Sequence, residues 1–445
     1  MLGRRPLLGG LASVAVGIAA SAPLNSLAVR RDAASLAYSP NALAGLEAAI
    51  GEMQRRSERD PRDPKGWRAN IDAHHAVCAA AANDDDAQVH GCWWFLPWHR
   101  AFLAVTEWKL RAISGDPSLA LPYWNWSSDR TIPAAFALPT SPLARAARYT
   151  PDRPLTPVEV DHLLHDGDMA RLGVAALGAR AFQAWAPEQI PRTFGGIAKP
   201  NPGQWHGRNR LEGIPHTAVH NYIGGEATNG SLGDMTQLST AANDPLFYAH
   251  HANLDRLWEN WRSDPLRRSG EPSVGAFLEE RFPFPWLDGT VITVTVADTL
   301  DTRRLGYTYD RIDVFRDGPP AIATRAGIYP RTPLALETVS LPRHTRPGER
   351  VLRIAGVQPG DRPFSVEIAL ARPGDHASAI SIGAHAVGRR QGQPAFPDTE
   401  PHFDVTAALH GLGTSAVDVI VLPLSLGPGE YTPPPFVYTS MEIVG

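Results

Sequence analysis

The chain has few cysteines, no strong excess of charge and one apolar run near its start. Its 445 residues include only two cysteines, too few for a scaffold held together by disulfides. The formal net charge is −4, so no basic field favours nucleic acid or an anionic membrane as a partner. After the first 28 residues, no stretch approaches the roughly 20 apolar residues of a membrane-spanning helix. These absences leave a globular protein, and a hydrophobic content of 43% supports a sizeable core.

The first 28 residues have the pattern of an export signal. A twin-arginine pair at positions 4 and 5 precedes an apolar run over residues 7–27. Residues 26–28 (Ser-Leu-Ala) offer a cleavage site, and residues 20–22 offer a weaker one because a proline follows. The alternative is a single membrane anchor, but the run is short and rich in alanine and glycine. We therefore expect a cleaved twin-arginine-type signal and a periplasmic or secreted protein without a stable membrane anchor.

Hydrophobic patterning divides the remaining chain into two parts. Apolar residues repeat at helical spacing over 39–126, 158–172, 217–222 and 245–261, and 41 prolines indicate long ordered loops between these segments. Strand signatures begin at 291–296 and continue at 351–354, 364–370, 378–382, 417–423 and 436–443. The sequence predicts a signal at 1–28, a mainly α domain at 29–317, a linker at 318–348 and a small all-β sandwich or barrel at 349–445.

Histidines in the mainly α domain are spaced like metal ligands. His216 and His220 are four residues apart, which places both on one face of a helix. His250 and His251 open an apolar helical segment, and adjacent helical residues diverge by about 100°. Only one member of this pair can therefore face the same metal as His216 and His220.

A second group of histidines lies upstream. His90 and His99 flank an aromatic run at residues 93–98, which forms either a dry wall around a metal or ordinary core, and His74 supplies a third imidazole. Two sets of three neutral imidazoles suit copper or zinc. The scarcity of nearby acids is unfavourable to magnesium and calcium. Spacing alone leaves the choice between copper and zinc open.

The segments around these histidines resemble a known family. Residues 90–100, ending Phe-Leu-Pro-Trp-His-Arg, and residues 243–258, Asn-Asp-Pro-Leu-Phe-Tyr-Ala-His-His-Ala-Asn-Leu-Asp-Arg-Leu-Trp, resemble the two copper-binding regions of the tyrosinase and polyphenol oxidase family of type-3 copper proteins. Residues 284–288 and 298–309, which include Tyr307-Thr308-Tyr309, resemble the plant-type central segment. The β-rich end, with residues 402–405, is similar in layout to the plant-type C-terminal domain. The resemblance covers nearly all of the chain after the signal and is looser after Pro330.

The resemblance implies a dinuclear copper site. Its two ions would be held by two sets of three histidines: His74, His90 and His99, and His216, His220 and His251. In the adjacent pair the family's ligand lies four residues before the aspartate, which selects His251 and leaves His250 as a supporting residue. Phe247 would pack beside the copper pair, unless it is plain core. Asp255 would hold a ligand histidine or Arg256 in place, unless it forms an ion pair on the helix surface.

Cys78 has two interpretations. In many members of the family, a cysteine shortly after the first ligand bonds covalently to the ring of the second ligand, which here pairs Cys78 with His90 in a thioether. Such a bond would fix the orientation of the His90 ring. The alternative is a Cys78–Cys92 disulfide, which an exported protein could form. The resemblance favours the thioether.

The implied activity is copper-dependent oxidation of o-diphenols to o-quinones, with O2 reduced to water. Glu212 resembles the glutamate that orients a water in relatives that deprotonate phenols. Thr217 and Asn221 follow two ligands, and threonine at 217, where good monophenol hydroxylases usually carry asparagine, favours diphenol oxidation. Leu238 stands where plant enzymes often place a gating phenylalanine. The alternatives are a tyrosinase proper, an o-aminophenol or methoxyphenol oxidase, a haemocyanin-like O2 carrier and a histidine-rich zinc hydrolase.

The resemblance also assigns a role to the C-terminal domain. In relatives this domain covers the copper site and keeps the enzyme latent until the linker is cleaved. A proline- and glycine-rich passage at 318–348 suits proteolysis. The pattern does not identify which residue of the domain covers the site.

Overall fold

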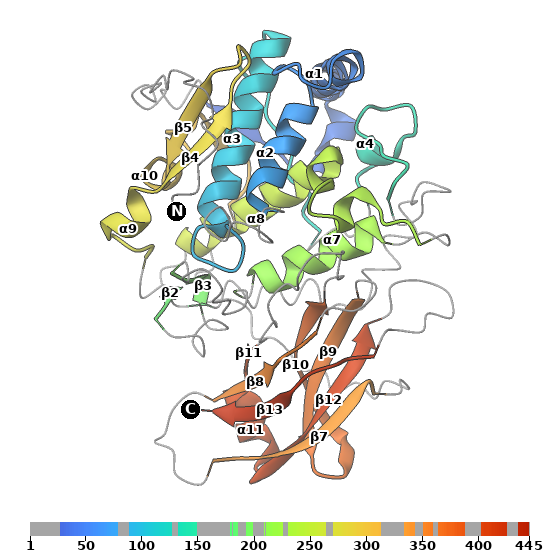
Figure 1. Cartoon of the computed structure of the whole chain (residues 1–445), viewed down its shortest axis with the longest axis vertical. Coiled ribbons are helices and arrows are strands. Elements are labelled where there is room, and N and C mark those ends of the chain that lie inside the picture. The colour runs from blue at the N-terminus through green and yellow to red at the C-terminus, as the bar shows by residue number, and fades with distance from the viewer. Residues whose placement is uncertain are drawn as a thin grey trace, which may run out of the picture.

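The computed structural model consists of a helical part and a β-rich part (Figure 1). Strands β9 and β10 of the β-rich part point towards helix α7 of the helical part. The structure describes residues 27–78, 89–126, 132–148, 179, 181–185, 193–198, 209, 211–225, 230–263, 270–312, 333–342, 350–358, 364–387, 402–424 and 435–444.

Two long helices form the centre of the helical part. Helix α3 (Phe95–Ser114) carries a proline in its first turn, where a missing N–H costs nothing, and ends at Gly115, whose φ of 72° closes the helix in the left-handed conformation. Helix α8 (Pro245–Ser263) packs against α3. Of its 19 residues 16 are buried, including charged ones. Burial of charge on this scale requires partners, and these partners shape the site described below.

The other elements of the helical part surround α3 and α8 in one hydrophobic core. They are β1 (Ala28–Arg30), η2 (Ala33–Tyr38), α1 (Pro40–Arg59), α2 (Arg68–Cys78), α4 (Ala134–Ala137), β2 (Ala181–Ala184), β3 (Thr193–Ile197), η5 (Glu212–His216), α7 (Thr217–Gly224), η6 (Asp234–Thr236), η7 (Ala241–Asn243), α9 (Gly275–Leu278), β4 (Arg281–Pro285), β5 (Val291–Thr295), α10 (Val296–Thr299) and β6 (Tyr307–Tyr309).

Strands β1 and β6 join the two ends of the helical part. They pair in parallel, with Ala28 opposite Tyr307 and Arg30 opposite Tyr309. Ala28 is the residue after which the stronger predicted signal cleavage would fall, so a cut there would remove one member of this pairing. Residues 1–26, with the rest of the predicted signal, lie outside the described residues. No helix among the described residues has the length and apolar character to cross a membrane.

The β-rich part contains two sheets over a common core. One sheet has the strand order β10-β9-β12-β7 and the other β11-β8-β13, and side chains from both enter one hydrophobic cluster. Valines and isoleucines dominate this cluster, as pleated half-buried surfaces favour. The strands are β7 (Ala335–Ser340), β8 (Val351–Ala355), β9 (Phe364–Arg372), β10 (Asp375–Val387), β11 (His402–Asp404), β12 (Ala416–Leu424) and β13 (Ser440–Val444).

The β-rich part differs from the sequence prediction in two respects. It is not all-β, because helix α11 (Thr406–Leu412) contributes Ala408, Leu409 and Leu412 to the core. Strand β7, inside the segment predicted as a linker, pairs antiparallel with β12. The strand was not predicted because it has only six residues, stands between two proline- and glycine-rich stretches, and pairs with a strand from elsewhere in the chain. The helix predicted at 158–172 lies outside the described residues.

Lys109 on α3 is a buried lysine whose amine contacts an amide. Its Nζ donates a hydrogen bond of 2.9 Å to Oδ1 of Asn70 on α2, and the side chain is 1% exposed. Burial lowers the pKa of Lys109 to about 8, below the value of about 10.4 for a free lysine. Between these two values the unfolded chain binds a proton that the folded chain does not, so the free energy of unfolding rises with pH in this window.

We expect Lys109→Met to raise the free energy of unfolding, relative to the wild type, more at neutral than at alkaline pH. Below about pH 8 the wild type carries the cost of a buried charge, and the variant does not. Relative to the variant, the wild type should gain about 3 kcal/mol between pH 7 and pH 10.5. Urea unfolding followed by tryptophan fluorescence measures this difference. The signal reports on the helical part, because all 12 tryptophans precede residue 290. Exposed Lys65→Met is the control, and a difference for Lys109→Met that does not change with pH would contradict the prediction.

Candidate metal centre

The six histidines proposed as ligands converge from four helices, one π-helical turn and one loop. His74 comes from α2, His99 from α3, His216 from η5, His220 from α7 and His251 from α8, whereas His90 precedes α3. Pro215 lies inside η5, where it has no N–H to donate, and the turn bonds from residue i to i+5 with the Thr217 amide donating to the Glu212 carbonyl. All six imidazoles are buried.

Four of the imidazoles are oriented by backbone carbonyls. The Nδ1 atoms of His74, His99, His216 and His220 lie 3.1, 2.8, 3.1 and 2.8 Å from the carbonyl oxygens of Leu238, Phe95, Glu212 and Met235. A carbonyl only accepts, so each Nδ1 carries the proton and each Nε2 carries the lone pair. This is the arrangement that metal-binding histidines adopt. The Nε2 of His99 is accordingly buried without a hydrogen-bond partner among the described residues.

The two groups of histidines face one another. In the second group, the ligand atoms of His216, His220, His250 and His251 all lie within 4.8 Å of one another, and the Nε2 atoms of His220 and His251 are 3.1 Å apart. In the first group the ring centroids are 5.2 to 6.4 Å apart. The groups meet at the stacked rings of His99 and His251, whose centroids are 4.3 Å apart and whose planes make an angle of 7°.

The surroundings keep the imidazoles neutral. Burial, and then repulsion from neighbouring imidazoles, lowers the pKa of His74, His216 and His251 well below the ordinary value. Burial also lowers the pKa of His99 to about 3. A neutral imidazole is the form that binds a metal ion. The six neutral imidazoles therefore fit two metal ions that prefer nitrogen ligands.

Aromatic side chains enclose the site. Phe247 is fully buried, and its ring centroid lies 4.2 Å from that of His251 and 4.9 Å from that of His74, so it contacts both groups. Phe95 lies 4.8 Å from His216 and 4.7 Å from His99. The aromatic run that the sequence offered either as a metal wall or as ordinary core thus contributes Phe95 to the wall.

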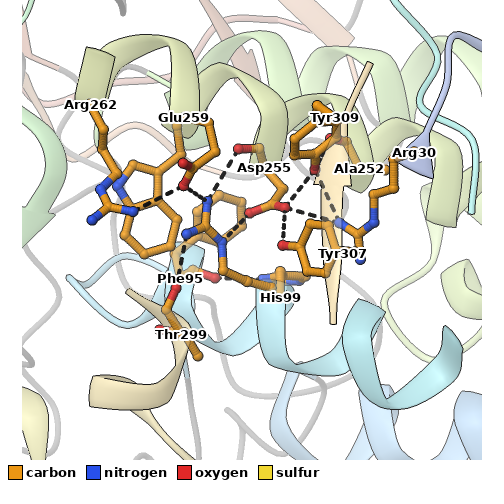
Figure 2. Close-up of polar contacts among 12 residues, drawn as sticks. Arg30, Phe95, His99, Ala252, Asp255, Glu259, Arg262, Thr299, Tyr307 and Tyr309 are labelled. Atoms are coloured by element: carbon orange, nitrogen blue, oxygen red, sulfur yellow. Dashed lines mark hydrogen bonds and ion pairs between the residues drawn. The ribbon is translucent and has the colours of Figure 1, made fainter. Parts of the chain in front are cut away.

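Asp255 is the centre of a buried charge network (Figure 2). Its carboxylate accepts hydrogen bonds from Arg100 and Arg30, and from the hydroxyls of Tyr307 and Tyr309 at 2.6 and 2.5 Å. Burial alone would raise the pKa of Asp255, but the two guanidinium groups and the two hydroxyls hold it below the ordinary value. The network joins β1, α3, α8 and β6. In the chain, Arg100 follows His99, and Asp255 lies four residues after His251.

The sequence prediction for Asp255 was wrong about its partners. It expected a ligand histidine or Arg256, or an exposed ion pair. Arg256 instead donates to Asn253 and Asn125, and Asp255 is 3% exposed. Arg30 and Arg100 were not predicted from the sequence, although Arg100 directly follows His99 and could have been suspected on that ground.

The residues predicted to tune the chemistry have defined contacts. The Glu212 carboxylate is fully buried and receives the Gly91 amide N–H at 2.8 and 2.9 Å from its two oxygens. The Thr217 hydroxyl donates to the backbone carbonyl of Glu212 at 3.0 Å. The Nδ2 of buried Asn221 has no hydrogen-bond partner among the described residues. Leu238 is half-buried, and its carbonyl orients His74.

The two cysteines are only partly described. The Cys92 side chain is buried, and its Sγ donates to the Val89 carbonyl at 3.4 Å. The side chain of Cys78 lies outside the described residues. The thioether between Cys78 and His90 therefore stays a prediction.

Comparisons with known proteins identify the family. The model described as the common central domain of tyrosinase matches residues 64–264, which contain all six histidines. Polyphenol oxidase E of Solanum lycopersicum is 32% identical over 280 residues, 60% of this chain and 46% of that protein. Catechol oxidase B of Solanum tuberosum is 31% identical over 299 residues, 64% and 50%. The chain thus spans about half the length of these relatives.

A solved structure extends the likeness to the β-rich part. The structure of latent apple tyrosinase superposes with a TM-score of 0.74 at 21% identity and covers 97% of this chain and 99% of that one. At this identity the likeness concerns the fold. The central domain of the chain, residues 64–264, belongs to the tyrosinase family, and the similar protein of Solanum lycopersicum is a polyphenol oxidase. The buried imidazole cluster is accordingly a dinuclear type-3 copper site, which decides the choice between copper and zinc that spacing left open.

We expect Asp255→Asn to destabilise the helical part by about 3 kcal/mol, the lower end for breaking a buried ion pair. The substitution removes the charge that Arg30 and Arg100 share, and leaves each with one other carboxylate, Glu107 and Glu259. Urea unfolding followed by tryptophan fluorescence measures the loss. The control is Asp301→Asn, which removes an exposed pair with Arg303 and should change stability by less than about 1 kcal/mol. Equal stability of the two variants would show that the network contributes little.

Proposed function

We propose that the protein is an oxidoreductase that oxidises o-diphenols to o-quinones at a copper pair and reduces O2 to water. Each diphenol gives up two electrons and two protons, and two such oxidations convert one O2 into two waters. A copper pair held here would supply the redox chemistry. The names polyphenol oxidase and catechol oxidase of two similar proteins support this assignment.

The proposed ligands are three imidazoles for each ion: His74, His90 and His99 for one, and His216, His220 and His251 for the other. The backbone carbonyls that hold four of the Nδ1–H groups would keep the Nε2 lone pairs aimed at the ions and prevent ring rotation. Phe247 and Phe95 would exclude water from the pair, which strengthens electrostatic contacts within the site.

The contact of Thr217 supports diphenol oxidation over monophenol hydroxylation. A monophenol must lose its proton before it reacts, and Glu212 is the carboxylate near the site that could serve as the base. The Thr217 hydroxyl donates to the Glu212 backbone carbonyl and not to its carboxylate. The Gly91 amide N–H is shared between the two carboxylate oxygens of Glu212. A water beside Glu212 could therefore donate to the Thr217 hydroxyl but would receive no hydrogen bond from it. We propose that a diphenol, which is more acidic, depends less on this water.

Thr217→Asn should raise the ratio of monophenol to diphenol turnover. The longer amide reaches past the backbone carbonyl and can hold a water against Glu212. The assay compares copper-loaded wild type and variant on tyramine and on its catechol counterpart. Thr217→Ser keeps the hydroxyl and is the matched control, expected to behave as the wild type. Substantial tyramine hydroxylation by the wild type without a lag would contradict the proposal, as would reversible O2 binding without turnover.

Leu238 would set the width of the path by which a phenol enters the proposed copper site. Its backbone is fixed by the contact of its carbonyl with His74, whereas its side chain is half-buried. A leucine leaves more room than a phenylalanine and offers no ring for stacking. We propose that phenols with bulky substituents, including aminophenols and methoxyphenols, are accepted.

We propose that the β-rich part keeps the enzyme latent. Strand β10 lies against η5 and α7, which carry His216 and His220 (Figure 1), and the similar apple protein is described as latent. We also propose export by the twin-arginine-type signal at 1–28. The domain limits stay proposals at 29–317 and 349–445, and the pairing of β7 with β12 supports an earlier start for the second domain.

Cleavage between Gly318 and Gly348 should raise diphenol turnover several-fold. A protease site introduced before β7 would release all four strands of the sheet that contains β10. The rates on 4-methylcatechol are compared before and after cleavage, with an uncleavable version of the same insertion as the control. Equal rates after complete cleavage and separation of the fragments would exclude latency, without affecting the assignment of the copper chemistry.

A further inference from the structure

Four imidazoles, and not three, gather at the second metal position. His250 belongs to the same compact group as His216, His220 and His251. Its ring stacks on that of His216 at 5.7 Å and 14°, and lies 5.2 Å from that of His220. A fourth imidazole on one ion would fill the coordination position that a catalytic site leaves open for its ligand. Some feature of the structure must keep His250 off the metal.

Trp126 provides this feature. Its indole Nε1–H donates to Nδ1 of His250 at 3.1 Å, and Trp126 is fully buried. An indole N–H can only donate, so Nδ1 of His250 supplies the lone pair of this bond. A neutral imidazole then carries its proton on Nε2. That nitrogen is buried and makes no well-formed hydrogen bond among the described residues.

We propose that Trp126 is a positioning residue that fixes His250 in the Nε2–H form and so excludes it from copper coordination. A protonated nitrogen has no lone pair for a metal ion. The bond to Trp126 therefore preserves an open position at the copper held by His216, His220 and His251. This inference requires the metal site but not the oxidation of diphenols.

The position of Trp126 is itself fixed by helix α8. The Trp124 amide donates to the Ala249 carbonyl at 2.9 Å, next to His250 in the chain. Almost two turns further along α8, Arg256 donates to Oδ1 of Asn125 at 3.1 Å. Residues 124–126 thus contact α8 through three consecutive residues. The indole donor and the His250 ring cannot move apart without breaking these contacts.

The first test measures the tautomer of His250 directly. The full chain, loaded with diamagnetic copper(I) and labelled with ¹⁵N-histidine, gives long-range ¹H–¹⁵N correlations that distinguish protonated from unprotonated ring nitrogens. The His250→Gln variant assigns the signals. We expect the His250 proton on Nε2 in the wild type. A proton on Nδ1, or copper coordination by His250, would overturn the proposal even if no variant of Trp126 folds.

The second test uses a variant in which His250 can bind at the open coordination position of the copper held by His216, His220 and His251. In Trp126→Phe the proton can move to Nδ1, so Nε2 gains a lone pair and can bind copper. We expect azide to bind the oxidised copper form about tenfold more weakly, and copper to leave more slowly to a chelator, within the range known for residues that support metal ligands. Trp261→Phe, which removes a buried indole hydrogen bond to Ala179, should leave both values unchanged.

A double variant separates positioning from general damage. If His250 is the group that closes the position, Trp126→Phe combined with His250→Leu should recover the azide affinity of His250→Leu alone. A purely structural role for Trp126 predicts faster copper loss and no recovery in the double variant, and that result would overturn the proposal. Loss of diphenol oxidation with intact azide binding would instead count against the proposed function.

Discussion

The site depends on hydrogen bonds between imidazole Nδ1–H groups and backbone carbonyls. A histidine side chain can rotate, and it can place its lone pair on either nitrogen. Carbonyls from an α-helix, a π-helical turn, a 3-10 helix and a loop remove both freedoms for four of the ligands. Backbone acceptors cannot be titrated and do not move independently of the fold. The geometry offered to the metal pair is therefore a property of the chain path.

The chain path is maintained in turn by a buried charge network with the Asp255 carboxylate at its centre. Asp255 binds two arginines and two tyrosine hydroxyls from three other elements, and Arg100 is adjacent to a proposed ligand. Burying these charges is costly unless every one has its partner. The charged groups therefore favour one mutual arrangement of α3 and α8, the two helices that carry His99 and His251. Hydrophobic packing alone would tolerate small shifts between these helices that the metal site would not.

The sequence predicted most of the site but little of its support. Histidine spacing and the surrounding motifs pointed to all six imidazoles, and the family and the copper assignment were confirmed. The partners of Asp255 could not be predicted because they lie as far away as residues 30 and 309, and no local pattern links them. Trp126 was missed because it follows Trp124 in an aromatic segment that looks like ordinary core. Helix α11 and strand β7 were missed because short elements depend on tertiary neighbours more than on propensity.

The parallel pairing of β1 with β6 has a consequence for how the protein is made. Arg30 belongs to the first strand of the described chain, and its tyrosine partners come 277 and 279 residues later. During synthesis, Arg30 and Asp255 have no complete set of neighbours until Tyr309 has left the ribosome. The helical part thus cannot finish its interior on a shortened chain, and a truncated product carries unpaired buried charge. The network therefore links completion of the interior to synthesis of the whole catalytic segment.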